Sequence, residues 1–199
     1  MKILAIETST PRTEIAFLDD ATLRFAESFV APRRETGPLF SLLERALAIG
    51  GNPDRVVIGT GPGSYNGIRA GIATAEALAM GLGRPVMGLS SLWGYELAAP
   101  DFAVVGDARS QQFYVAHFQN GKLVSGPKLL SEAEAVAQVG SLPVTGPAPL
   151  AAFPTLVPGF PSAVQLARVA AERDPAAYPA QPIYLKPAHI TSCKPAKGS

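Results

Sequence analysis

Apolar and polar positions along the chain change period several times, and each change predicts a new element. In the first half, short apolar or alternating runs are typical of strands, whereas leucine and alanine recurring every three or four residues are typical of helices. The predicted strands cover residues 3–6, 14–18, 24–30, 55–58 and 85–89. The predicted helices run from Thr36 to Ile49 and from Gly67 to Leu82. Strands that alternate with helices in this way indicate an α/β fold.

A second unit is predicted to begin near Pro100. Its clearest signal is a hairpin, in which the strand "QFYVAHF" is joined to "KLVSG" by Asn120 and Gly121. The other predicted elements are a helix capped by Ser90, strands at 102–105 and 142–145, a short helix led by Ser131, and a helix from Ser162 to Arg173. We therefore divide the chain into an N-terminal subdomain, residues 1–99, and a smaller, loop-rich C-terminal subdomain, residues 100–199.

The two helices of the N-terminal subdomain carry apolar surface that we expect to bind a partner. In the second helix, Gly67, Gly71 and Ala75 place small residues four positions apart, a spacing that lets another helix approach closely. With the leucine-rich face of the first helix they are expected to form an exposed apolar patch. The alternative is that both helices simply cover the sheet. The predicted interface residues are Leu39, Leu42, Leu43, Ala46, Leu47, Ile68, Gly71, Ile72, Ala75 and Ala79.

A glycine-rich turn, "IGTGPGSYNGIRAG", joins a predicted strand to the second helix. Such a turn can hold a phosphate with its backbone amides, since glycine allows close approach and the helix start is positive. The specific fingerprints are missing, because Ile68 and Arg69 stand where a P-loop needs Lys and Ser or Thr, and the glycine spacing differs from the dinucleotide pattern. We therefore interpret the turn as a tight connection. Any nucleotide-proximal role would fall to Thr8, Ser9, Gly61, Gly63, Ser64 and Gly67.

Composition and charge narrow the classes of function. The net charge of +1 predicts no strong sequence-independent attraction to nucleic acid or anionic lipid. One cysteine, Cys193, excludes an internal disulfide and a cysteine-based metal cluster. The apolar run before Glu7 is too short for a signal peptide, and no run approaches the length of a membrane span. We therefore expect a cytoplasmic protein without a membrane partner.

Few residues are candidates for chemistry. Neither histidine, His117 or His189, has a second ligand at metal spacing, and no Gly-x-Ser-x-Gly elbow is present. Glu7 and Asp107 end predicted strands, where carboxylates can hold a metal-nucleotide or orient water, or can equally act as structural acids. We therefore predict no catalytic residue and no metal ligand.

Several motifs in order resemble the TsaB (YeaZ) family. They are "ILAIETST", "GTGPGSYNGIRAGIATAEALA", "VMGLSSL", "VVGDARSQQFYVAHF" and "PIYLKP". The resemblance implies an actin-like ATPase (ASKHA, ribonuclease H-like) fold of two subdomains, the second shortened. It also implies a paralogue of the TsaD (Gcp) proteins, once classed as M22 glycoproteases, which serve in making threonylcarbamoyladenosine in tRNA.

The resemblance implies a partner subunit without catalysis of its own. The catalytic paralogue holds a metal with two histidines on the helix after its third strand, and residues 36–49 contain none. The implied function is to pair with a TsaD-type paralogue, or with a second copy when alone. The implied complex includes a TsaE-type ATPase and transfers threonylcarbamoyl to the adenosine beside the anticodon (position 37) of tRNAs that read ANN codons. No cofactor is implied for this chain, although ATP is possible in the complex, and tRNA is implied to bind only through the complex.

Two other functions remain open at this point. One is an ATP-binding transferase or M22-type glycoprotease that acts alone. The other is a direct tRNA-binding module, for which the fold would have to bring basic residues together. Those residues are Arg33, Arg34, Arg69, Lys186 and Lys194. The chain also departs from the family's pattern at Glu7, where Asp is more frequent, and at Glu35 and Thr36, where the family often has "HS".

Overall fold

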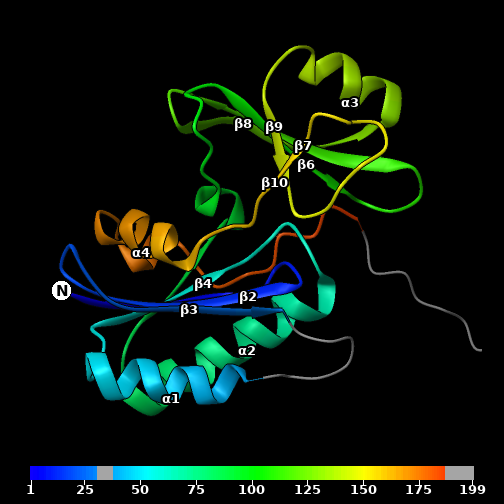
Figure 1. The fold of residues 1–199 in the computed structure, drawn as a ribbon. Helices are drawn as coiled ribbons and strands as arrows, with labels where there is room; N and C mark the ends of the chain where they lie inside the picture. The colour runs from blue at the N-terminus through cyan, green and yellow to red at the C-terminus, as the bar shows by residue number, and fades with distance from the viewer. Residues whose placement is uncertain (31–37, 187–199) are drawn as a thin grey trace, which may run out of the picture.

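The computed structural model describes residues 1–30 and 38–186, which form two five-stranded sheets stacked with helices in four layers. Figure 1 shows the second sheet with α3 at the top, α4 (Ala163–Ala171) below it, then the first sheet, and α1 (Leu39–Gly50) with α2 (Tyr65–Leu82) at the bottom. The first sheet is therefore covered on both faces. Sheets buried on both faces need strands that are apolar on both sides.

The first sheet has the strand order β3-β2-β1-β4-β5. Its strands are β1 (Lys2–Glu7), β2 (Arg12–Asp19), β3 (Thr22–Val30), β4 (Arg55–Gly59) and β5 (Val86–Leu89). The first three strands pair antiparallel, whereas β4 and β5 run parallel to β1. The five strands predicted from the pattern are confirmed, each within a few residues.

Alternation along β1 shows how the sequence fills both faces of this sheet. Leu4 and Ile6 point into one core together with α1 and α2, while Ile3 and Ala5 point into the other core with α4. Successive side chains of a strand face opposite sides, so a run without polar residues is what two covered faces require. The predicted helices α1 and α2 are confirmed, with α2 beginning at Tyr65.

The second sheet has the order β10-β9-β6-β7-β8. Its strands are β6 (Phe102–Asp107), β7 (Gln112–Gln119), β8 (Lys122–Ser131), β9 (Val144–Gly146) and β10 (Val157–Pro158). The predicted hairpin is confirmed, and Asn120 and Gly121 both take the positive φ that its tight turn requires. The predicted Ser131 helix is α3 (Glu132–Val139), which begins with a reciprocal capping box between Ser131 and Glu134.

The C-terminal part of the chain returns to the first sheet. We predicted that residues 100–199 form one subdomain, but α4 packs on β1 and β2, and Arg55 of β4 donates hydrogen bonds to the carbonyls of Ala170 and Arg173. The second subdomain therefore consists of β6 to β10 with α3. The chain after Pro161, beginning with α4, packs again on the first subdomain. The apolar period of α4 predicts a helix but not the sheet that it covers.

Some predictions need smaller adjustments. Ser90 caps a single 3₁₀ turn, η1 (Ser91–Gly94), and Tyr95 is already extended. A second 3₁₀ turn, η2 (Pro175–Ala177), follows α4. Within the described ranges, no helix has both the length and the apolar character needed to cross a bilayer. The predictions for Arg33, Arg34, Glu35, Thr36, His189, Cys193 and Lys194 lie outside the described residues.

Candidate partner interface

The predicted partner surface is for the most part the side of α1 and α2 that faces the sheet. Exposure is 8% or less for Leu39, Leu42, Leu43, Ala46, Ile68, Ile72, Ala75 and Ala79, and Gly71 is also buried. All of these except Gly71 belong to the core that also holds Leu4 and Ile58 of the sheet. The prediction of an exposed patch at these positions is therefore wrong. The alternative that we stated for this stripe, that it covers the sheet, is what the structure has.

The small residues of this stripe let α2 approach the turn after β1. A methyl group on Gly71 would overlap the Thr8 hydroxyl, and one on Gly67 would overlap the Thr8 carbonyl. The Thr8 hydroxyl donates a hydrogen bond of 2.8 Å to the Gly67 carbonyl. Gly67 and Gly71 are therefore needed for packing within the chain, and they are not available to a second helix.

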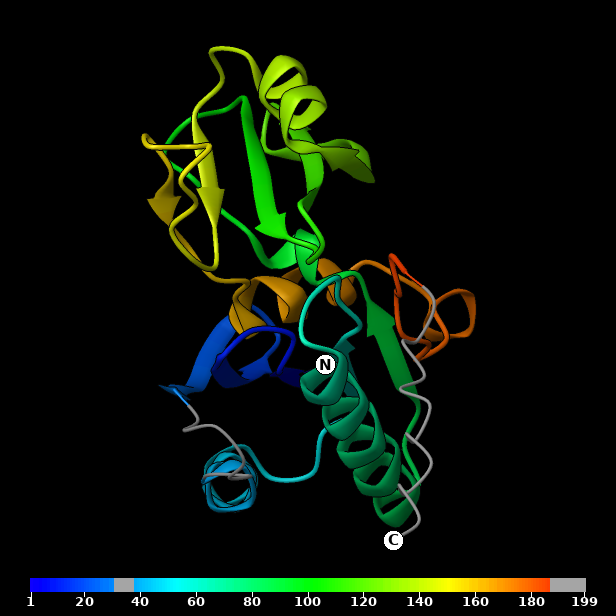
Figure 2. The same cartoon turned by 90° about the vertical axis from the view of Figure 1, so that its right-hand side faces the viewer.

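A groove lies on the outer side of the same two helices. α1 packs on β2 and β3 whereas α2 packs on β4 and β5, so the two helices separate, as Figure 2 shows from the side. The groove has a volume of about 450 Å³. It is lined by Phe40, Leu43, Glu44 and Leu47 of α1 and by Ala73, Thr74, Ala77 and Leu78 of α2. We call this set the α1–α2 groove; Leu43 and Leu47 are the only predicted interface residues that line it.

The chemistry of the α1–α2 groove suits an apolar helix face. Phe40, the aromatic residue of the lining, is 60% exposed. Ala73 and Ala77, one helical turn apart, form a floor of small side chains. The Thr74 hydroxyl already donates to the Ala70 carbonyl at 2.8 Å, and the remaining polar side chain in the lining is Glu44. A groove with so few free polar groups does not match a small polar ligand, but small residues allow a helix backbone to come close.

The sequence carried a signal for this second face. Phe40 lies at the edge of the buried stripe of α1, on the same side as Leu43 and Leu47, and a large aromatic residue outside that stripe indicates an exposed apolar site. In α2, Ala70, Ala73 and Ala77 form a second stripe of small residues beside the one that we used. Periodicity alone does not say which stripe faces the sheet.

The glycine turn is filled by the protein itself. The Ser64 amide donates to the Ser9 carbonyl at 2.6 Å, and a methyl group on Gly63 would overlap that same carbonyl. The Ser64 hydroxyl caps α2 by accepting from the Gly67 amide. Thr8 and Ser9 are buried, so the predicted nucleotide-proximal residues do come together, but the Thr8–Ser9 turn takes the space at the helix start. The turn is therefore a packed connection between β4 and α2.

Glu7 is buried where the two sheets meet. One carboxylate oxygen accepts from the Ser9 amide at 2.6 Å, whereas the other has no hydrogen-bond partner. Burial raises the pKa of the Glu7 carboxyl, and the nearby Glu14 raises it further, although the Ser9 amide and the neighbouring Ser9 and Ser91 side chains oppose the shift. A raised pKa makes this carboxyl harder to deprotonate, and metal ligands must be deprotonated, so burial disfavours Glu7 as a ligand for Mg²⁺.

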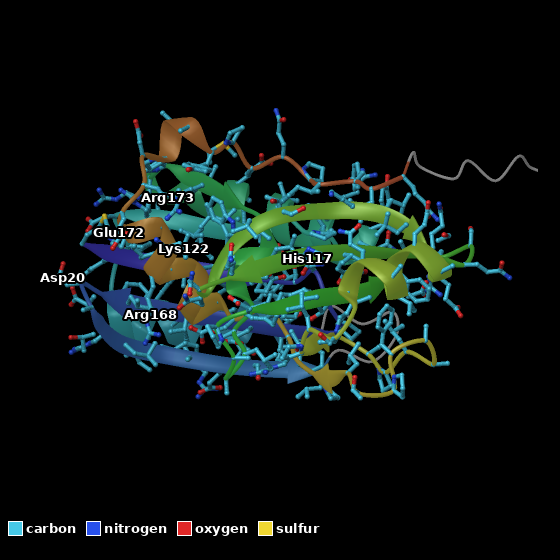
Figure 3. All side chains as sticks on the ribbon, turned by 90° about the horizontal axis from the view of Figure 1, so that it is seen from above. Asp20, His117, Lys122, Arg168, Glu172 and Arg173 are labelled. Carbon is cyan, nitrogen blue, oxygen red and sulfur yellow. The ribbon has the colours of Figure 1, made fainter. Side chains whose placement is uncertain are left out.

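Asp107 and His117, the other described candidates for chemistry, do not form a common site with Glu7. Asp107 is exposed and accepts a hydrogen bond from the Arg109 amide in its own turn at 2.7 Å. His117 lies within the second sheet (Figure 3), where burial and the charge of Lys128 lower its pKa. Among residues 1–30 and 38–186, no group of three His, Cys, Asp or Glu side chains is placed to hold a metal ion.

Comparisons with known proteins agree with the fold and with the motifs. The family model described as TsaD, tRNA N6-adenosine threonylcarbamoyltransferase, matches residues 40–155. An uncharacterized protein of Mycobacterium tuberculosis is 34% identical over 198 residues, which cover 92% of this chain and 91% of that protein. The tRNA threonylcarbamoyladenosine biosynthesis protein TsaB of Escherichia coli is 32% identical over 130 residues, 60% of this chain and 55% of that one.

A solved structure, YeaZ from Pseudomonas aeruginosa, superimposes with a TM-score of 0.71 at 24% identity, covering 92% of this chain and 99% of that one. This match confirms the predicted fold class, an actin-like and ribonuclease H-like α/β fold with two subdomains. The match of the family model extends over more than half of the sequence. The chain therefore belongs to the TsaD family, in its TsaB (YeaZ) group.

Proposed function

We propose that this chain is a non-catalytic partner subunit of a complex that transfers threonylcarbamoyl to the adenosine beside the anticodon of tRNA. In this proposal it binds a TsaD-type catalytic paralogue through the α1–α2 groove, and a TsaE-type ATPase completes the complex. When the paralogue is absent, a second copy of the chain takes its place. The observation that carries the proposal is the groove of apolar and small side chains on two helices whose other faces are already buried.

The apolar lining of the groove fits a place within a larger assembly interface. A stable interface buries about 800 Å² on each partner. Phe40 and Leu47 of α1 and Leu78 of α2 supply apolar contacts. Met80, two residues after Leu78 in α2, is 81% exposed and adds to this apolar surface. An apolar surface of this kind is stabilised when a partner removes it from water. We infer that an apolar helix face of the related catalytic subunit fills this groove.

The absence of catalysis is supported by the site at the end of β1. In actin-like ATPases this turn and the following glycine turn face the nucleotide, but here Ser9 and Ser64 are hydrogen-bonded to each other. The Glu7 carboxyl is buried, and burial raises its pKa. We infer that the ATP-dependent step and the transfer itself take place in the partner proteins.

The alternative is an enzyme that acts alone, either an ATP-binding transferase or an M22-type glycoprotease. It predicts turnover by the isolated chain, and a rise in thermal stability with millimolar ATP. Residues 1–30 and 38–186 contain no serine or cysteine paired with a histidine, as nucleophilic catalysis would need. We therefore place this alternative second.

A drop-out assay tests the proposal. Purified catalytic paralogue, its ATPase partner, threonylcarbamoyl-adenylate and tRNA are combined with and without this chain, and the modified nucleoside is measured. We expect transfer only when the chain is present, and none from the chain alone. Transfer that proceeds equally without the chain would contradict the proposal, and turnover by the isolated chain would favour the alternative.

A further inference from the structure

Two exposed tyrosines stack on each other at the start of α2, with an arginine over one of them. The ring centroids of Tyr65 and Tyr184 are 5.1 Å apart with 29° between the ring planes, yet the residues are 42% and 44% exposed. The Arg69 guanidinium lies 5.3 Å from the centre of the Tyr65 ring and donates a hydrogen bond of 2.6 Å to its hydroxyl. The three side chains thus hold one another in place while their outer faces meet solvent.

The chain around Tyr184 is fixed from both subdomains. The Ile183 amide donates to the Thr60 carbonyl at 2.9 Å, at the glycine turn of the first sheet. The Lys186 ammonium donates to the Arg109 carbonyl at 2.7 Å, in the turn between β6 and β7. These contacts bring Lys186 and Arg109 to the same side as the tyrosine pair. We call Tyr65, Arg69, Tyr184 and Lys186 the stacking cluster.

The charge of this region is positive. In the part of the chain that the structure describes, Arg69, Lys186 and Arg109 form no ion pair with a carboxylate, and the nearby acid is Asp107, which accepts from the Arg109 amide. The overall charge of +1 therefore hides a local excess of cations around Tyr65 and Tyr184.

Exposed aromatic rings beside unpaired cations match the chemistry of a single nucleic-acid strand. Bases stack on aromatic side chains whatever their sequence, and arginine adds a cation–π contact, while lysine and arginine neutralise phosphates. A paired duplex does not offer its base faces, so it would meet only the cations. Stacking on the ring faces therefore predicts a preference for unpaired over paired nucleic acid, which charge alone does not predict.

We propose that the stacking cluster binds an unpaired stretch of RNA, with a base stacked on the Tyr65–Tyr184 pair and phosphates near Arg69 and Lys186. This deepens the proposed function, on which the choice of RNA rests, because it gives this chain its own contact to the RNA that the complex modifies. The α1–α2 groove does not include these residues, so both surfaces can be occupied at once.

The test measures binding of the full-length chain to a labelled single-stranded RNA of about ten nucleotides. We expect Tyr184→Leu to weaken binding about ten-fold without changing its salt dependence, because a stacking contact is lost and no charge is removed. Arg69→Gln should weaken binding less and reduce the slope of log K against log salt by about 0.7. A blunt-ended RNA duplex of two strands, which has no unpaired bases, should not distinguish Tyr184→Leu from the unchanged chain.

Matched variants separate stacking from damage to the fold. Tyr184→Phe keeps the ring and should bind like the unchanged chain, and Arg84→Gln removes an exposed cation at the other end of α2 and should have no effect. Equal RNA binding by Tyr184→Leu and the unchanged chain, or no binding by the unchanged chain at about 50 mM salt, would overturn the proposal.

Gel filtration of the same variants with the catalytic paralogue distinguishes this proposal from the proposed function. Cluster variants should assemble normally while binding RNA weakly. Normal assembly together with unaltered RNA binding would overturn only the RNA proposal, whereas failure of the unchanged chain to assemble would contradict the proposed function.

Discussion

The inner and outer faces of α2 carry similar small side chains but meet different surroundings. On the inner face, Gly71 and Ala75 are fully covered by the first sheet and the turn after β1. On the outer face, Ala73 and Ala77 line the α1–α2 groove and remain exposed. Small residues at helical spacing therefore have two uses in one helix, close packing inside the chain and a floor for a second molecule.

This difference teaches that a substitution on α2 separates folding from assembly according to the face that it changes. The inner face is part of the folded core, so a change there acts on the free energy of unfolding. The outer face contributes little to that free energy, so a change there acts on binding. Substitutions on each face, and in the rest of the chain, test this separation.

A carboxylate on the inner face should unfold the protein. Ala75→Glu places a charge without a partner at a position that is 0% exposed. We expect the free energy of unfolding to fall by about 3–5 kcal/mol, the cost typical of an unpaired buried charge. Denaturant unfolding followed by circular dichroism measures it. A stable, folded Ala75→Glu protein would show that this face is not buried in solution.

The same change on the outer face should leave the fold intact and prevent assembly. Ala77→Glu puts a charge on the floor of the α1–α2 groove, where a partner helix would desolvate it. We expect a melting temperature within a few degrees of the unchanged chain, and an affinity for the catalytic paralogue at least about 30-fold lower, equivalent to about 2 kcal/mol.

Ala48→Glu is the matched control for this variant. Ala48 is an exposed alanine of α1 that does not line the groove, so the same new charge should leave affinity unchanged. Isothermal titration calorimetry compares the three proteins. If Ala77→Glu binds as tightly as Ala48→Glu, the groove is not the interface.

Replacing the buried acid should stabilise the protein in a pH-dependent way. The folded-state pKa of Glu7 is raised above its ordinary value of 4.5, so the folded protein holds this proton more tightly than the unfolded chain. The free energy of unfolding therefore falls as pH rises from about 4.5 toward the folded-state pKa, and stays lower above it.

Glu7→Gln removes this loss, because the amide is neutral at every pH and can still accept from the Ser9 amide. We expect the free energy of unfolding to rise near pH 7 and the gain to shrink toward pH 4, where the Glu7 carboxyl is protonated as well. Thermal unfolding from pH 4 to pH 8 measures it. A gain that is the same at both ends of this range would mean that Glu7 does not titrate as described.

A change in the second subdomain should affect stability alone. Ser131→Ala removes the capping box at the start of α3, in which the Ser131 hydroxyl accepts from the Glu134 amide. We expect a loss of about 1 kcal/mol in the free energy of unfolding. Binding to the catalytic paralogue, measured in parallel, should be unchanged, because α3 lies on the far sheet from the groove (Figure 1). Weaker binding would show that the interface extends to the second subdomain.

Local signals predicted most elements, and the contacts between distant elements are what they missed. The apolar run of β1, the alternation at residues 14–18 of β2 and the Asn120–Gly121 turn are local properties, so the strands and the hairpin followed from the sequence. The return of α4 to the first sheet depends on contacts between residues more than a hundred positions apart, as between Arg55 and Ala170. No local period encodes such a contact.

Most residues of the α1–α2 groove were missed for the same reason, since only Leu43 and Leu47 were among the predicted interface residues. The sequence indicated that α1 and α2 have more apolar surface than one sheet face covers, and the groove is lined by part of that surface. It did not indicate which stripe was in excess, because Gly71 and Ala73 are equally small. The direction of a helix face is set by the sheet beneath it, here by the contact of Gly71 with Thr8.

The path of the final segment has a consequence for the order in which the chain folds during synthesis. The Tyr178 carbonyl accepts from the Gly88 amide and so covers the open side of β5, while α4 covers a whole face of the first sheet. During synthesis, the strands of this sheet leave the ribosome long before α4 and Tyr178 do. The N-terminal subdomain, although made first, is therefore completed last, and until then an edge strand and an apolar sheet face remain open to chaperones and to other nascent chains.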